Sequence, residues 1–153
     1  MRIPIIAIAF LLFLLIPFEF TAEQYLCIAE QSSGFRFDET TKSWKSAIFK
    51  TDHKYILRNK KEGDSKFFDA EYKLVVTEVG FDYPICICTD DADKYGHVRC
   101  NCFPDGGFKF NKKNLRFLNI FSMGYVNVLP DQNKTTDSTS ASPNMEIGKC
   151  SPF

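Results

Sequence analysis

The sequence is poor in the residues and motifs that most catalytic sites require. It has two histidines and one tryptophan in 153 residues, and it has no G-x-S-x-G, H-E-x-x-H or phosphate-binding loop. Its 19 basic residues are balanced by 19 acidic residues, with no charged block in either half. Because nucleic-acid binding needs a basic surface to displace phosphate counterions, we expect no nucleic-acid partner.

An apolar run follows Arg2 at the start of the chain. It extends from Ile3 to Phe18, which is short for a membrane span of roughly 20 residues. One basic residue before such a run is typical of a secretory signal peptide. We therefore predict a signal peptide over 1–22, cleaved after Ala22, and an exported protein that is periplasmic or extracellular. An uncleaved anchor is the alternative, and membrane contact is expected only through this segment.

Residues 23–153 have the length of one domain and a pattern typical of strands. Apolar and polar residues alternate with period two, which puts successive side chains on opposite faces. The candidate strands are 34–37, 54–58, 71–80, 107–110, 114–121, 123–129 and 144–150. Short polar turns separate them, which predicts an all-β fold, an antiparallel barrel or sandwich of about eight short strands. The only helical pattern is a short one over 64–74, with Asp64 as its cap.

One segment of the predicted domain differs from the rest. Residues 130–144 are polar, rich in serine and threonine, and contain a proline near each end. This composition predicts a mobile polar loop before the last strand.

Four of the six cysteines lie in two C-x-C pairs, Cys86 with Cys88 and Cys100 with Cys102. An antiparallel hairpin that places Cys88 opposite Cys100 also places Cys86 opposite Cys102, with all four sulfurs on one face. Directly opposed residues can have Cα atoms about 4.5 Å apart, which is within disulfide range. We therefore predict two structural disulfides across this hairpin, because exported proteins mature in oxidising compartments.

The remaining cysteines, Cys27 and Cys150, lie near opposite ends of the domain. A disulfide between them would join the first strand to the last, as a closed barrel or sandwich permits. Six cysteines allow 15 connectivities, so this pairing is the preferred hypothesis and not the only one.

Two other interpretations of the C-x-C pairs remain open. Cys86, Cys88, Cys100 and Cys102 could hold a zinc ion, which prefers four sulfurs in a tetrahedron, although zinc knuckles more often use C-x-x-C. The same thiols could form a redox centre, or one could act as a nucleophile with His97, if they were reduced. Apart from this zinc alternative, the sequence predicts no cofactor.

The segments GFRFDETTKSWKSAIFKTDHKYILR, LRFLNIFSMGYV and MEIGKCSPF resemble small exported bacterial proteins that have no assigned activity. The resemblance implies export, and it assigns no catalytic residue. We expect a non-enzymatic protein that binds a protein partner or a small apolar ligand. A carrier with a hydrophobic ligand in its barrel is an alternative that rests on the 16 phenylalanines. Trp44 is expected in the core or in the wall of a binding cavity.

Overall fold

The computed structural model describes residues 24–66, 68, 71–88, 91–125 and 142–153. The predicted signal peptide and residues 130–141 of the predicted loop lie outside the described residues. The strands are β1 (Gln24–Asp38), β2 (Ser43–Ile48), β3 (Lys54–Asn59), β4 (Leu74–Glu78), β5 (Pro84–Cys88), β6 (His97–Cys102), β7 (Gly106–Asn111), β8 (Arg116–Phe121) and β9 (Asn144–Pro152).

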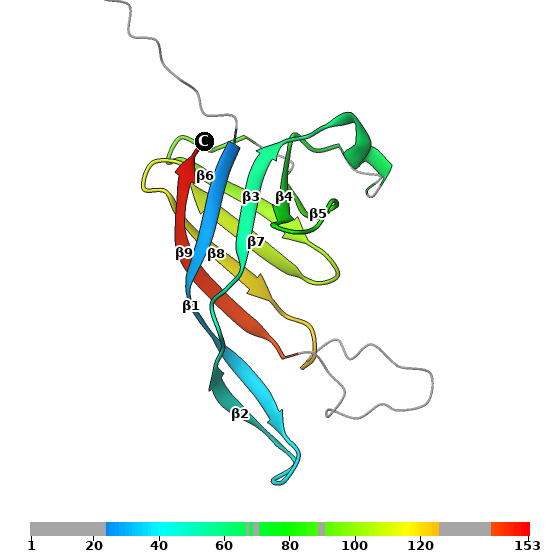
Figure 1. Ribbon diagram of the computed structural model, residues 1–153, viewed down its shortest axis with the longest axis vertical. Helices are drawn as coiled ribbons and strands as arrows, with labels where there is room; N and C mark the ends of the chain where they lie inside the picture. Colours follow the sequence, from blue (N-terminus) through cyan, green and yellow to red (C-terminus); the bar gives the residue numbers. More distant parts are fainter. Residues whose placement is uncertain (1–23, 67, 69–70, 89–90, 126–141) are drawn as a thin grey trace, which may run out of the picture.

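The strands form one antiparallel sheet that closes on itself. Their order is β2-β1-β3-β4-β5-β6-β7-β8-β9, and β1 also pairs with β9. Eight strands therefore make a closed barrel, and β2 is added outside it (Figure 1). The all-β prediction is confirmed, and of its two forms the structure is the barrel. Closure removes the exposed edges that an open sheet would have.

The long strand β1 belongs to two parts of the molecule. It pairs with β3 from Gln24 to Ile28. On its other side it pairs with β9 from Tyr25 to Gly34. Its second half pairs with β2 from Ser33 to Asp38. The β1–β2 hairpin projects from one end of the barrel, and we call it the arm (Figure 1).

The interior of the barrel is filled by side chains that alternate inward along the strands. Phe108 and Phe117 stack with their ring centroids 5.1 Å apart, and Tyr55 meets both rings edge-on. Burial of each large apolar side chain contributes about 1.5–3 kcal/mol. The other buried members of this core are Cys27, Ala29, Leu57, Leu74, Val76, Cys86, Cys88, Val98, Cys100, Phe110 and Cys150.

The chain covers part of its own outer wall. Val75 of β4 and Ile87 of β5 point away from the interior, yet they are buried because Tyr72 and Phe68 pack over them. At β4 and β5, the outer face of the barrel is therefore covered by side chains of the same chain.

A 3-10 helix, η1 (Glu62–Lys66), overlaps only the start of the short helix predicted over 64–74. It begins before residue 64, and residues 71–73 are not helical. Asp64 does not act as a helix cap. Its carboxylate accepts hydrogen bonds from residues that precede it in the chain: from both terminal nitrogens of Arg58 and from the Lys61 N–H. These bonds fix a tight turn where the pattern predicted a longer helix. Within the described part of the chain, no helix has the length and hydropathy to span a membrane.

Candidate binding groove

All six cysteines are joined in disulfides. The pairs are Cys27–Cys150, Cys86–Cys102 and Cys88–Cys100. The register of β5 and β6 places Cys86 opposite Cys102, and that of β1 and β9 places Cys27 opposite Cys150. The structure thus contains the same pairs that the hairpin register and the terminal pairing predicted. Three disulfides indicate an oxidising, non-cytoplasmic environment.

The disulfides bear directly on the zinc and redox alternatives. Zinc binding and nucleophilic attack both need thiolates, and no cysteine of the chain is free in this structure. His97 is exposed and lies on the face of β6 opposite to the buried Cys100. Its Nδ1 lies 3.3 Å from the carboxylate of Asp93, so it faces a turn and not the sulfurs.

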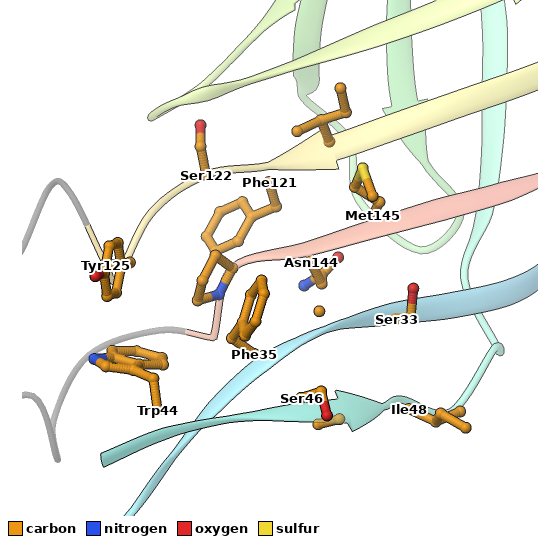
Figure 2. Close-up of a pocket in the computed structure, with 14 residues that line it drawn as sticks. Ser33, Phe35, Trp44, Ser46, Ile48, Phe121, Ser122, Tyr125, Asn144 and Met145 are labelled. Atoms are coloured by element: carbon orange, nitrogen blue, oxygen red, sulfur yellow. The ribbon is translucent and has the colours of Figure 1, made fainter. Parts of the chain in front are cut away.

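A groove lies where the arm leaves the barrel. It has a volume of about 1210 Å³ and lies between the arm and the ends of β8 and β9 (Figure 2). Its lining residues are Ser33, Gly34, Phe35, Trp44, Ser46, Ala47, Ile48, Ile120, Phe121, Ser122, Tyr125, Pro143, Asn144 and Met145. Figure 2 shows the rings of Phe35, Trp44 and Tyr125 gathered at one end of the groove.

Aromatic contacts fix one wall of the groove. The ring of Trp44 packs edge-on against Phe37, with centroids 5.7 Å apart, and against Tyr125 at 5.6 Å. Such pairs contribute about 0.5–1.5 kcal/mol beyond the area they bury. Trp44 therefore forms part of a cavity wall, which is one of its two predicted places.

A glycine allows the arm to approach the start of β9. A Cβ atom on Gly34 would lie 2.1 Å from the carbonyl oxygen of Pro143. The neighbouring Phe35 N–H donates a 3.0 Å hydrogen bond to that same carbonyl oxygen. Any larger residue at 34 would push the two backbones apart, so Gly34 positions the arm against the barrel.

The groove is apolar and uncharged. None of the lining residues in the described part of the chain is Asp, Glu, Lys, Arg or His. Ile48 is 88% exposed and Phe35 is 54% exposed, although both are large apolar side chains. Among the described residues, the groove lining offers no strong acid or base for catalysis, and it can bury the apolar surface of another molecule.

An apolar strip continues from the groove along the outer wall of the barrel. We define this outer strip as Ile28, Ile120, Met145 and Ile147. Met145 and Ile147 alternate with the buried Glu146 and therefore point outward, and about half of each side chain is exposed. The outer strip is open, whereas the outer wall at β4 and β5 is covered by Tyr72 and Phe68.

A buried polar cluster lies inside the barrel beside the start of the arm. The carboxylate of Glu146 accepts a hydrogen bond from the Tyr55 hydroxyl and lies 2.6 Å from Nδ1 of His53. Asn119 donates a 3.1 Å hydrogen bond to the same hydroxyl. Ser32 is opposite Glu146 in the register, and its buried hydroxyl has no hydrogen-bond partner in the described part of the chain.

Glu146 raises the pKa values of both groups that it contacts, His53 and Tyr55. Burial lowers the pKa of His53, but the hydrogen bond and charge of Glu146 outweigh it, and with Glu78 and Asp52 they raise the pKa above its usual value. Burial, and then the bond to Glu146, raise the pKa of Tyr55. The cluster ties the start of β3 to β9, because Tyr55 of β3 and His53, which directly precedes β3, both bind the carboxylate of Glu146 in β9.

The sequence did not identify Glu146 or most of the groove. Glu146 could have been found from its spacing, because it has the same parity as Cys150 on a strand whose cysteine must point inward. Ile48 and Met145 gave no such signal, since exposed apolar residues are common on protein surfaces.

The described groove lies outside the barrel, while aromatic and aliphatic side chains fill the interior. An apolar ligand inside the barrel would therefore compete with buried residues such as Phe108 and Phe110.

No protein-family model matches this chain, and neither a curated protein nor a solved structure matches it. The resemblance to small exported bacterial proteins thus stays a prediction.

Proposed function

We propose that this protein is exported and non-enzymatic, and that it binds an apolar segment of another protein in the groove between the arm and the barrel. The observation that carries the proposal is the uncharged apolar lining of an open groove on a rigid, disulfide-linked barrel. Its volume of about 1210 Å³ exceeds that of small-molecule pockets, which are about 300–1,000 Å³.

Several features support a protein partner over a small ligand. The exposed apolar residues extend beyond the groove along the outer strip, so the apolar surface is elongated. Such patches, rimmed by polar residues, are typical of protein–protein contacts. Ser33, Ser122 and Asn144 supply polar groups among the lining residues.

The chain contains a built-in reporter for this site. Trp44 is the only tryptophan and lies in the groove wall. We expect the apolar dye anilinonaphthalene sulfonate to bind with micromolar affinity and to take up excitation energy from Trp44. Because the dye tests for apolar binding and not for partner class, peptides with spaced apolar residues should then displace it.

A matched pair of variants tests the location. Phe35→Ser removes a groove side chain that is 54% exposed, and Phe81→Ser removes one that is 49% exposed at the β4–β5 turn. Loss of one buried apolar contact should weaken dye binding about tenfold for Phe35→Ser, with no change for Phe81→Ser. Equal effects of the two variants, or no energy transfer from Trp44 in the unmodified protein, would disprove the proposed site.

A further inference from the structure

The arm contains a strand edge that the barrel does not use. Among the described strands, β2 pairs only with β1. Its other edge faces away from the barrel (Figure 1). An exposed edge presents unpaired N–H and C=O groups, which makes it a template for another strand.

The hydrogen-bond pattern shows which groups face the free edge. The Phe49 N–H donates to the Ser32 carbonyl at 3.1 Å, while the Phe35 N–H turns the other way, to Pro143. Hydrogen-bonded and non-hydrogen-bonded pairs alternate along antiparallel strands. The backbone groups of the odd-numbered β2 residues therefore bond to β1. The N–H and C=O groups of Trp44, Ser46 and Ile48 therefore point to the free edge.

We infer that β2 pairs with β2 of a second copy, antiparallel and about a twofold axis at Ser46. This register places Trp44 opposite Ile48 of the second copy, and Ser46 opposite Ser46. All the outward backbone groups of β2 find partners in it, and the contact is the same on both copies, as twofold symmetry requires. Trp44 and Ile48 lie on one face, so the opposed pairs are aromatic with β-branched, which stabilises a sheet.

Charge disfavours the neighbouring register centred on Lys45. A shift of the axis to Lys45 would place Lys45 opposite itself, and directly opposed like charges destabilise a sheet. With the axis at Ser46, Lys45 is opposite Ala47 of the second copy. Its ammonium group also lies 2.5 Å from the Asp38 carboxylate, which balances its charge within the same arm.

The pairing explains why Ile48 is the most exposed large apolar residue in the part of the chain that the structure describes. Ile48 is 88% exposed in one copy, and the second copy would cover it with Trp44. Trp44 and Ile48 both line the groove, so each copy would add a residue to the groove of the other. The inference goes beyond the proposed function, because two copies can pair whether or not the groove binds a further partner.

The test is the mass of the purified mature protein in solution, measured by analytical ultracentrifugation over a range of concentrations. We expect a reversible dimer with twice the monomer mass. Ser46→Pro removes an N–H that β1 does not use, and Ile48→Glu places a charge opposite Trp44. Each should raise the dissociation constant at least about tenfold, while Val79→Glu, a change at an exposed β-branched residue in the β4–β5 turn, should leave it unchanged.

A cross-link gives a second readout that does not depend on a weakened dimer. Ser46→Cys places two thiols across the axis, where hydrogen-bonded opposed residues have Cα atoms about 5.5 Å apart. It should form a cross-linked dimer on mild oxidation, whereas Ala47→Cys, on the other face, should not. A monomer at every concentration, or a dimer that Ser46→Pro and Ile48→Glu leave intact, would overturn the inference. Dye binding that persists in a monomer would leave the proposed function standing.

Discussion

The disulfide Cys27–Cys150 should stabilise the protein more than either bridge of the β5–β6 hairpin. It joins residues 123 apart in sequence, whereas Cys88–Cys100 joins residues 12 apart. In the chain-entropy model, the longer loop corresponds to about 5 kcal/mol and the shorter to about 3 kcal/mol. Replacing Cys27 and Cys150 by alanine should therefore lower the free energy of unfolding by about 2 kcal/mol more than replacing Cys88 and Cys100.

The two double variants are closely matched in burial. Cys27 and Cys88 are completely buried, and Cys150 and Cys100 are each 5% exposed. The cost of the cavities left by the sulfurs should therefore be similar in both. Because Cys86–Cys102 still closes the hairpin around Cys88 and Cys100, the shorter bridge should contribute even less than its isolated estimate.

Urea unfolding under non-reducing conditions, followed by far-ultraviolet circular dichroism, measures both losses. A loss of about 5 kcal/mol is a large share of the 5–15 kcal/mol that stabilises a typical domain, so the Cys27/Cys150 variant should have a much lower midpoint. Equal losses in the two variants, or a greater loss for the hairpin pair, would refute the loop-length reasoning.

Two further predictions concern the polar cluster and the arm. The pKa of His53 is raised in the folded state, so its contribution to stability is present below the unfolded pKa and is lost as pH rises through the folded pKa. Its side chain is 45% exposed, so the free energy of unfolding, measured with urea, should fall by less than about 1 kcal/mol over this pH range. The fall should be absent in His53→Gln. If the variant kept the same pH dependence, the pairing with Glu146 would not be its cause. Gly34→Ala should cost about 1–3 kcal/mol, because the added Cβ meets the Pro143 carbonyl oxygen; a thermal midpoint equal to that of the unmodified protein would contradict that contact.

The cysteine pairs of the hairpin could be read from the sequence because their geometry is local. Two C-x-C pairs put their sulfurs on one face of their strands, and only one register opposes both pairs at once. The fold class was predictable for a similar reason, since period-two patterns with short turns recur along the chain.

The face of Phe35 could not be read from the sequence. Counting by twos from the buried Cys27 would point Phe35 into the barrel. A β-bulge between Ala29 and Gln31 shifts the register of β1 against β9. The bulge reverses the parity, so that Ser32 is buried and Phe35 reaches the groove. No residue of this stretch is a glycine or proline that would mark such a bulge.

Peptide mapping of the non-reduced protein tests most directly the central claim that three disulfides hold this barrel closed, together with the proposed export and removal of residues 1–22. It should find an N-terminus at Glu23 and linked peptides for Cys27–Cys150, Cys86–Cys102 and Cys88–Cys100. A retained N-terminal segment together with free thiols, or a different set of cysteine pairs, would contradict it.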